Sequence, residues 1–487
     1  MVLLAACNFS IRFPLHSKPF LRILLGMNVH QVDFSEGKVS SCILRLSFPL
    51  IIAEIVNLLY NMVDRIFIGH IPGVGSAALS GIGLCFPIIS LISAFARLYG
   101  FNGGAPLCSM ARGNGDKEEA SYVMGNSVAL AIVTGIIIEV VLLVFLKPIL
   151  YAFGASDISY VYASDYLRIY SLGSVAVLLT LTMNAFINSQ GFSQVGMISV
   201  LIGALTNIVL DPILIFKFGL GVKGAAIATV ISQTLSALYA LFFLIGKNAE
   251  IELNFKYFKL KRSRCFRIIA LGTSGFTMGA TNSLVQLVCN KMAFMTGGDL
   301  YVGVMTILNS VREIFSTPIS GIGSGASPVM SFNYGRRDGE RVRKASNFTL
   351  YSTLLISLTV WLVVFLFPRY VAMLFTDDAI LIDSSVRALK IYFFGFVFMS
   401  FQTAGQQTFV ALGKAKHAVF FSLFRKVIIV VPLTIILPYF FSSDGVVLAE
   451  PISNVVGGLA AYITMRRVVM PELDQMKEES SSKSGGR

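Results

Sequence analysis

Charged side chains are scarce in this chain of 487 residues: Asp, Glu, Lys and Arg make up 13%, against 55% hydrophobic residues. Soluble globular domains carry roughly 25% charged residues, so the composition excludes an ordinary water-soluble protein. The high apolar content equally excludes a disordered chain. Cysteine is also sparse, with six residues and no Cys-x-x-Cys pair, which excludes a disulfide-stapled secreted fold. The class that fits is a polytopic membrane protein.

Motifs for catalysis and metal binding are missing as well. The sequence has no Gly-x4-Gly-Lys-Ser/Thr phosphate loop and no His-Glu-x-x-His zinc motif, and its four histidines are scattered. The glycine-rich string at 321–325 has no preceding strand, so it indicates close helix packing rather than a nucleotide site. We expect no cofactor, no resident metal and no enzymatic activity. A membrane-embedded enzyme is the alternative from a different class.

Long apolar segments are what the sequence has in abundance. A bilayer span needs about 20 apolar residues, and twelve such segments alternate with short polar or Gly/Pro loops. The predicted spans are residues 43–68, 78–101, 121–146, 163–187, 195–216, 223–246, 267–295, 301–325, 347–367, 388–411, 418–440 and 446–466. We therefore predict an all-α integral membrane protein with twelve transmembrane helices. An even number of spans puts both ends of the chain on one side.

Basic residues indicate which side that is. The formal net charge is +13, with seven basic residues between Lys247 and Arg267 and five between Arg336 and Lys344. Both clusters lie between apolar spans without aromatic stacking partners, so they indicate no nucleic-acid partner. Loops after even-numbered spans are the basic ones, and the positive-inside rule makes those loops cytoplasmic. We expect a multi-pass protein of the cytoplasmic cell membrane, surrounded by lipid, with both termini in the cytoplasm.

The sequence also repeats itself at one constant separation, the number of positions from Gly103 to Gly325, which we call the repeat offset. The coinciding pairs are Gly103 and Gly325, Pro106 and Pro328, Gly113 and Gly335, Asp116 and Asp338, Phe153 and Phe375, Tyr170 and Tyr392, Gly173 and Gly395, and Gly191 and Gly413. Two homologous six-helix bundles with the same orientation are therefore predicted. Such a parallel repeat suits a central cavity and alternating access.

These observations divide the chain into five parts. They are an N-terminal cytoplasmic segment 1–42, an amino lobe 43–246, a basic linker 247–266, a carboxy lobe 267–466 and a polar cytoplasmic tail 467–487. Met27 is an alternative start, in which case residues 1–26 would be an annotation artefact.

Ionisable residues inside the predicted spans are the candidates for function, because a charge at the bilayer centre costs at least ~2.5–3.5 kcal/mol. Asn207 and Asp211 are spaced i, i+4 and share a helix face, and Pro212 loosens the backbone beside them. Asp64 lies late in the first span. Two carboxylates facing one dry cavity can hold a proton or share a sodium ion. A loop-end position for Asp64 and a helix-packing role for Asn207 with Asp211 are the alternatives.

Other ionisable residues within the spans are interpreted as structural. They are Glu54, Glu139, Lys291, Arg312, Glu313 and Glu450.

Several motifs together resemble the multidrug and toxic compound extrusion (MATE) family. They are residues 59–69 (LYNMVDRIFIG), 103–107 (GGAPL), 207–212 (NIVLDP), 224–229 (GAAIAT) and 328–335 (PVMSFNYG), and the similarity runs over residues 44–468. The resemblance implies two six-helix lobes forming a V around a central cavity. It also implies export of cationic or amphipathic compounds, driven by inward proton or sodium flow, and hence xenobiotic transport and antibiotic resistance.

The family's cation site falls on specific residues of this sequence. It corresponds to Asp64, Asn207, Asp211 and Thr229, with Tyr166 nearby, and the first four would also suit Na⁺.

The sodium-driven branch has carboxylates in helices 7 and 10, where this chain has amides. These amides are Asn282, Gln286, Gln402, Gln406 and Gln407. The resemblance therefore implies coupling in the amino lobe alone, as in the damage-inducible and staphylococcal-type branch. It leaves proton and sodium coupling as alternatives.

A substrate cavity is expected between the lobes, where flexible and aromatic side chains suit promiscuous recognition. The candidates are Met183, Phe186, Met278, Met399 and Gln402. A monomer would suffice for this function. A lipid-linked oligosaccharide flippase is the alternative in the same larger group, but it needs a cationic cavity. Interior Lys and Arg are few in the sequence, apart from Arg97 and Arg312.

Overall fold

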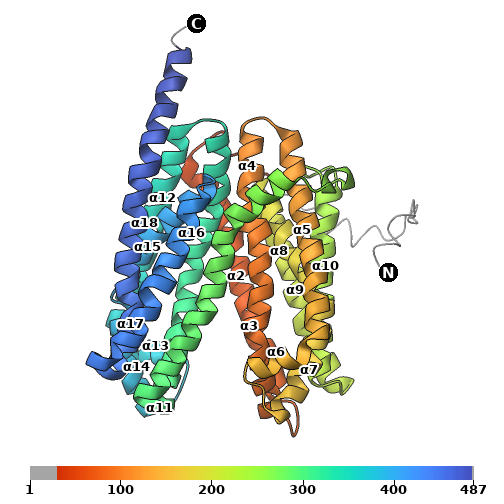
Figure 1. The fold of residues 1–487 in the computed structure, drawn as a ribbon, viewed down its shortest axis with the longest axis vertical. Helices are drawn as coiled ribbons and strands as arrows, with labels where there is room; N and C mark the ends of the chain where they lie inside the picture. The colour runs from red at the N-terminus through yellow and green to blue at the C-terminus, as the bar shows by residue number, and fades with distance from the viewer. Residues whose placement is uncertain (1–29, 485–487) are drawn as a thin grey trace, which may run out of the picture. The chain divides into compact units, whose positions relative to one another are not determined.

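The computed structural model describes residues 30–484, and every regular element within them is a helix (Figure 1). From Val32 on, the described chain forms one compact unit. The proposals for residues 1–26 and for a start at Met27 lie outside the described residues.

We call the first half, α2 to α10, the amino bundle. Its helices are α2 (Val39–Gly69), α3 (Gly75–Tyr99), the π-helical turn η2 (Gly100–Gly104), α4 (Ala105–Gly113), α5 (Lys117–Val144), α6 (Leu146–Ala152), α7 (Asp157–Leu172), α8 (Ser174–Ser189), α9 (Ser193–Pro212), the π-helical turn η3 (Ile213–Lys217) and α10 (Val222–Ile245). A linker with the short helix η4 (Phe255–Phe258) follows.

We call the second half, α11 to α18, the carboxy bundle. Its helices are α11 (Arg262–Gly335), α12 (Gly339–Leu366), α13 (Pro368–Met373), α14 (Ala379–Phe393), η5 (Phe396–Phe398), α15 (Met399–Ala411), α16 (Ala415–Leu423), the π-helical turn η6 (Phe424–Val430), α17 (Val431–Ile436) and α18 (Pro438–Ser484). α11 is two helices joined at Gly298, whose φ of 62° is outside the helical range.

The predicted spans all coincide with helices. By length and apolar composition, eight helices of the described chain could cross a membrane, and the pair α7–α8, bent by 55°, makes a ninth. The predicted spans 267–295 and 301–325 lie in α11 on either side of Gly298, and the span 388–411 covers the end of α14 and all of α15. The predicted all-helical membrane fold is confirmed.

The sequence repeat is also a repeat of structure. α12 begins and ends one repeat offset after α5, and α14 begins one repeat offset after α7. Asp116 and Asp338, which precede α5 and α12, have nearly the same backbone angles (φ −89°, ψ 78° and φ −89°, ψ 79°). Each carboxylate accepts a hydrogen bond from a backbone N–H in its own helix, at 2.8 Å and 3.0 Å, which satisfies a donor that the helix leaves free.

The two bundles touch through glycines that exchange contacts. A Cβ on Gly113 would lie 1.9 Å from the carbonyl oxygen of Phe332, and a Cβ on Gly335 would lie 2.1 Å from that of Met110. Met110 and Phe332 are themselves separated by the repeat offset. Only glycine allows backbones to approach so closely, so the repeat extends to the interface between its two copies.

Further contacts between the bundles lie toward the same end. Gly321 and Gly325 of α11 pack on Ile51 and Ser47, in the first half of α2, and Gly279 packs on Ala94 in the last turns of α3. The start of α2 and the end of α3 are therefore in contact with the carboxy bundle. The described ends of the chain share this end of the molecule, since Arg341 donates to the carbonyl of Phe34 and the neighbouring Arg343 pairs with Asp474 of α18 (Figure 1).

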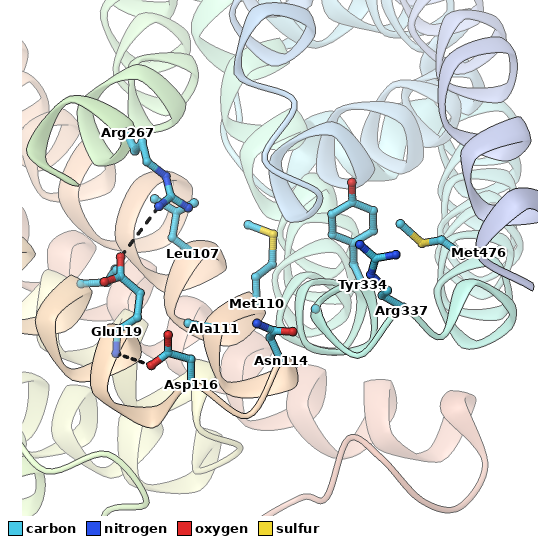
Figure 2. A pocket seen from close by; sticks show the side chains of 12 residues that line it. Leu107, Met110, Ala111, Asn114, Asp116, Glu119, Arg267, Tyr334, Arg337 and Met476 are labelled. Carbon is cyan, nitrogen blue, oxygen red and sulfur yellow. Dashed lines mark hydrogen bonds and ion pairs between the residues drawn. The ribbon is translucent and has the colours of Figure 1, made fainter. Parts of the chain in front are cut away.

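A cavity of about 340 Å³ lies where the bundles meet at this end. Figure 2 shows Met110 and Asn114 from the amino bundle across from Tyr334 and Arg337 of the carboxy bundle. Glu119, on the wall of the cavity, pairs with the Arg267 guanidinium at 3.8 Å. Both bundles therefore contribute residues to the wall of this cavity, and an ion pair joins them there.

Candidate cation-coupling site

Three helices of the amino bundle bring the predicted coupling residues together. α2 contributes Asp64, α9 contributes Asn207 and Asp211, and α10 contributes Thr229. The Asn207 amide donates to the Asp211 carboxylate at 3.2 Å and to the Thr229 hydroxyl at 3.5 Å. Asp64 is only 8% exposed and Asp211 is fully buried. The site is thus a buried polar network rather than a loop-end carboxylate.

The two carboxyl groups also face each other directly. The side chains of Asp64 and Asp211 are within hydrogen-bonding reach of one another. An ionised carboxylate only accepts hydrogen bonds, so a bond between the two groups requires a proton on one of them. The geometry therefore suits a pair of carboxyl groups that shares one cation.

Tyrosines cover this pair. The Tyr166 hydroxyl lies within reach of Thr229 and within electrostatic range of Asp64, so the structure brings the predicted Tyr166 into the site. Tyr60, one turn before Asp64 on α2, lies within reach of Gln233 and near both carboxylates. The sequence analysis missed Tyr60 and Gln233, although the i, i+4 spacing of Tyr60 and Asp64 was available as a signal.

Three oxygen atoms in the site lack a partner. Asp64 Oδ1, Asn207 Oδ1 and Asp211 Oδ2 are buried and accept no hydrogen bond from any residue that the structure describes. Leaving a buried polar atom unpaired costs about 1–3 kcal/mol, and oxygens are the ligands that hard cations prefer. The donor set fits a proton or Na⁺. The described chain contains no group of three or more His, Cys, Asp or Glu side chains arranged for a metal ion.

The backbone around the site is irregular for identifiable reasons. Pro212 ends the regular part of α9 and is followed by the π-helical turn η3. Proline lacks an N–H and cannot complete the helical hydrogen-bond ladder, and π-helical turns are frequent at functional sites. Asp211 therefore lies at a point where α9 can change its winding.

The predicted substrate-cavity residues fall into two groups. Met183 and Phe186 are 1% and 0% exposed and pack inside the amino bundle, so they face no open space in this conformation. Met278 and Met399 are half-buried, and Gln402 is buried with its Oε1 unpaired. The sequence could not separate these groups, because burial depends on how each helix is rotated.

The amides of the carboxy bundle do not form a counterpart of this site. Asn282 and Gln286 are exposed, Gln407 is half-buried, and the Gln406 amide donates to the Ala418 carbonyl at 2.8 Å and to Ser422 at 2.9 Å. These side chains are not gathered around one point.

The carboxy bundle has a buried charge cluster of which the sequence analysis named Glu450, as a structural residue, and missed the two basic partners. Arg425 and Lys426 of η6 are 9% and 3% exposed, and both pair with Glu450 of α18 at 3.0 Å. The expectation that interior basic residues are few apart from Arg97 and Arg312 is therefore wrong. Two adjacent basic residues inside the apolar span 418–440 were the signal. The correction removes the argument from charge against a flippase.

A helical membrane protein of two repeated bundles, with a carboxylate pair buried in one of them, is a secondary transporter in architecture. The MatE family model matches residues 49–213 and 276–436, more than half of the sequence. The chain belongs to the MATE family, as its motifs predicted.

Relatives agree with this assignment over nearly their whole length. Multidrug export protein MepA of Staphylococcus haemolyticus is 25% identical over 450 residues, covering 92% of this chain and 98% of that protein. MepA of Staphylococcus aureus strain NCTC 8325 is 25% identical over 430 residues, covering 88% and 94%. The outward-facing structure of a multidrug resistance MATE transporter of the MOP superfamily superimposes with a TM-score of 0.85 at 25% identity, covering 92% and 99%. These relatives are described as multidrug transporters, not as flippases.

Proposed function

We propose that this protein is a secondary active exporter of cationic or amphipathic small molecules, with cation coupling at Asp64 and Asp211. The observation that carries the proposal is the set of three unpaired, buried oxygens around this carboxyl pair. A proton or Na⁺ entering the site would satisfy them. No further cofactor is required, and the two bundles of one monomer supply the whole machinery.

The coupling step follows from the geometry of α2 and α9. With the site occupied, the repulsion between the two carboxylates is neutralised, and α2 can pack closely on α9. With the site empty, the negative charge favours a cationic solute in the cavity between the bundles. Alternation between these states would exchange an inward-moving cation for an outward-moving solute.

We infer the orientation from charge. The end at which the bundles touch carries the basic linker and the basic loop near Arg336, and the positive-inside rule makes such an end cytoplasmic. Contact between the bundles at this end would close the cytoplasmic side. The chain would then be a multi-pass protein of the cell membrane in a state that releases solute outward. Half-buried Met278 and Met399 are our candidates for solute contact.

Transport in proteoliposomes tests the proposal. A fluorescent cationic dye is loaded and its movement is followed under an imposed proton gradient or an imposed sodium gradient. We expect one gradient to drive transport in the wild type, and Asp64→Asn and Asp211→Asn to reduce it to the level of empty liposomes. Glu139→Gln is the control, because Glu139 lies on α5 in the same bundle and outside the network.

Two outcomes would contradict the proposal. Dye that moves under neither gradient would exclude cation-driven export of such compounds. Full transport by Asp64→Asn, with the ion dependence of the wild type, would exclude coupling at this carboxyl pair.

A further inference from the structure

The carboxy bundle buries more positive than negative charge. Arg425 and Lys426 share a single carboxylate, that of Glu450. Arg312 of α11 lies within electrostatic range of Glu450 and makes no hydrogen bond or ion pair with any described residue. Among the described residues, the exposed Glu313 is the one further carboxylate near Arg312, and the buried Tyr392 also lies within its electrostatic range. Three cations therefore face one buried and one exposed carboxylate.

Such an excess is expensive inside a membrane protein. The effective penalty for burying an ion is several kcal/mol, and a carboxylate partner offsets it only in a good geometry. Glu450 is already shared by two basic side chains, so with all three basic groups protonated one positive charge has no counter-ion even when Glu313 is counted. A mobile anion would remove this imbalance.

The unpaired hydrogen-bond donors of the cluster also indicate a site for an anion. The Nε atoms of Arg425 and Arg312 are both buried and have no acceptor within the described part of the chain. The Arg425 side chain is otherwise held in place, because its Nη1 donates to Glu450 at 3.0 Å and to Asn454 at 2.7 Å. Gly457 leaves room for its stem, since a Cβ there would lie 3.1 Å from Arg425 Cγ. A fixed guanidinium with a free donor is a typical arrangement for binding an anion.

The position of the cluster excludes a solvated surface patch. At the repeat offset, its residues correspond to small side chains in spans of the amino bundle. The pairs are Arg312 with Ser90, Arg425 with Gly203, Lys426 with Ala204, and Glu450 with Ala228. Ala228 precedes Thr229 of the coupling site. The cluster therefore lies inside the carboxy bundle, with Arg425 and Lys426 about one to two helical turns from the positions that correspond to Asn207 and Asp211.

We propose that Arg312, Arg425, Lys426 and Glu450 form an anion-binding site in the carboxy bundle. Its ligand is either an inorganic anion or the carboxylate or phosphate group of an exported solute. Arg312 is the partly exposed member of the cluster and is the side from which an anion would enter. Binding of the anion follows from the cluster alone, whereas its delivery by a solute also rests on the proposed export function.

Binding is tested on the full chain in lipid nanodiscs. Chloride, acetate or inorganic phosphate is titrated into a buffer whose anion is gluconate, and two readouts are recorded: the unfolding temperature and the fluorescence of Trp361, the single tryptophan of the sequence. A ligand that binds only the folded state raises its stability in a saturable manner. We expect a saturable rise for at least one anion in the wild type and its loss in Arg312→Gln and Arg425→Gln.

The variants separate an anion site from a purely structural cluster. Arg312→Gln removes a charge that has no ion pair, so its unfolding temperature in gluconate should equal or exceed that of the wild type. The control Arg97→Gln removes an exposed arginine from α3 of the amino bundle and should keep the full response to anions. The proposal is overturned if no anion stabilises the wild type, or if Arg312→Gln responds as the wild type does.

A pair of dyes identifies the source of the anion. Rhodamine 110 carries a free carboxylate that rhodamine 123 carries as a methyl ester, and both are offered to proteoliposomes under the driving gradient. If the solute supplies the anion, Arg312→Gln slows rhodamine 110 at least tenfold more than rhodamine 123. If an inorganic anion occupies the site, removing chloride changes both dyes equally in the wild type and neither in Arg312→Gln. Saturable anion binding without movement of either dye would leave the site standing and reject the proposed export function.

Discussion

The two bundles share a backbone plan and differ in the sign of the charge that they bury. The amino bundle holds Asp64 and Asp211 with no buried cation paired to them, whereas the carboxy bundle holds Arg425 and Lys426 around Glu450. At the repeat offset, Asp64 corresponds to Gln286 and Asp211 to Leu433. The comparison teaches that the scaffold does not dictate the chemistry. Helix lengths and caps persist, and so does the buried Ser109, whose counterpart is Ser331, while the two buried carboxylates of the amino bundle have no acidic counterpart.

The energetics of the two clusters differ as well. The net charge of a carboxyl pair depends on whether a proton is bound to it, so binding or loss of the proton can change the interactions of the pair. The trio of Arg425, Lys426 and Glu450 is joined by several hydrogen bonds of 2.7–3.2 Å, one of them to Asn454. Breaking it leaves buried cations without a partner. On the proposed function, binding of a cation would therefore change the charge of the Asp64–Asp211 pair, whereas the trio of Arg425, Lys426 and Glu450 keeps its ion pairs.

The largest effect on stability is expected for Glu450→Gln. It leaves Arg425 and Lys426 without their carboxylate, and removing one partner of a buried ion pair costs about 3–5 kcal/mol. Asp211→Asn should leave stability unchanged or raised, because it removes a buried carboxylate that has no cation beside it. Thermal and denaturant unfolding in detergent micelles measure both variants.

A second variant tests whether the loss of stability comes from unpaired charge or from lost packing. Glu450→Gln combined with Lys426→Met should recover part of the lost stability, because one unpaired cation is removed. If Asp211→Asn proved as destabilising as Glu450→Gln, the distinction between the two clusters would be lost.

An intermediate effect is expected at the interface between the bundles. Gly113→Ala and Gly335→Ala each introduce a methyl group about 2 Å from a carbonyl oxygen of the other bundle, and overpacking of this kind costs about 1–3 kcal/mol. Both should weaken contact at this end by similar amounts, seen as a longer distance between spin labels placed on the two bundles. Gly83→Ala on α3 is the control, because nothing lies within 4 Å of its new methyl group. Unequal effects of the two glycines would show that the interface is less symmetric than its contacts.

The smallest effect is expected at the repeated helix caps. Asp116→Ala and Asp338→Ala each remove one hydrogen bond to a helix N-terminus, and the loss of such a cap costs about 1 kcal/mol. The two variants should lower the unfolding temperature equally, and serine at either position should restore most of it. A lower unfolding temperature for only one of the two variants would identify the bundle that unfolds first.

The sequence predicted what depends on local pattern. Span positions follow from apolar length, and the repeat follows from glycines and prolines at one offset. The residues predicted for coupling, from Asp64 to Thr229, came from family motifs, and the structure brings them together, while their role stays a prediction.

Other features depend on packing that no local pattern records. The burial of Met183 and Phe186 depends on the rotation of α8, and the break at Gly298 depends on how two helices meet. Arg425 and Lys426 were concealed because a long apolar run can include two charges and still qualify as a span.

The exchanged glycine contacts have a consequence for how such a chain could have arisen. Gly113 meets Phe332 and Gly335 meets Met110. Because Gly335 is the equivalent of Gly113 and Phe332 is the equivalent of Met110, each bundle makes the same contact with the other. This is the rule of an isologous dimer, here made within one chain. Two separate copies of a single bundle could make the same interface, but every buried charge would then occur in both copies or in neither. Opposite charges in the two halves require that each half can be mutated without changing its twin, as two repeats within one chain allow.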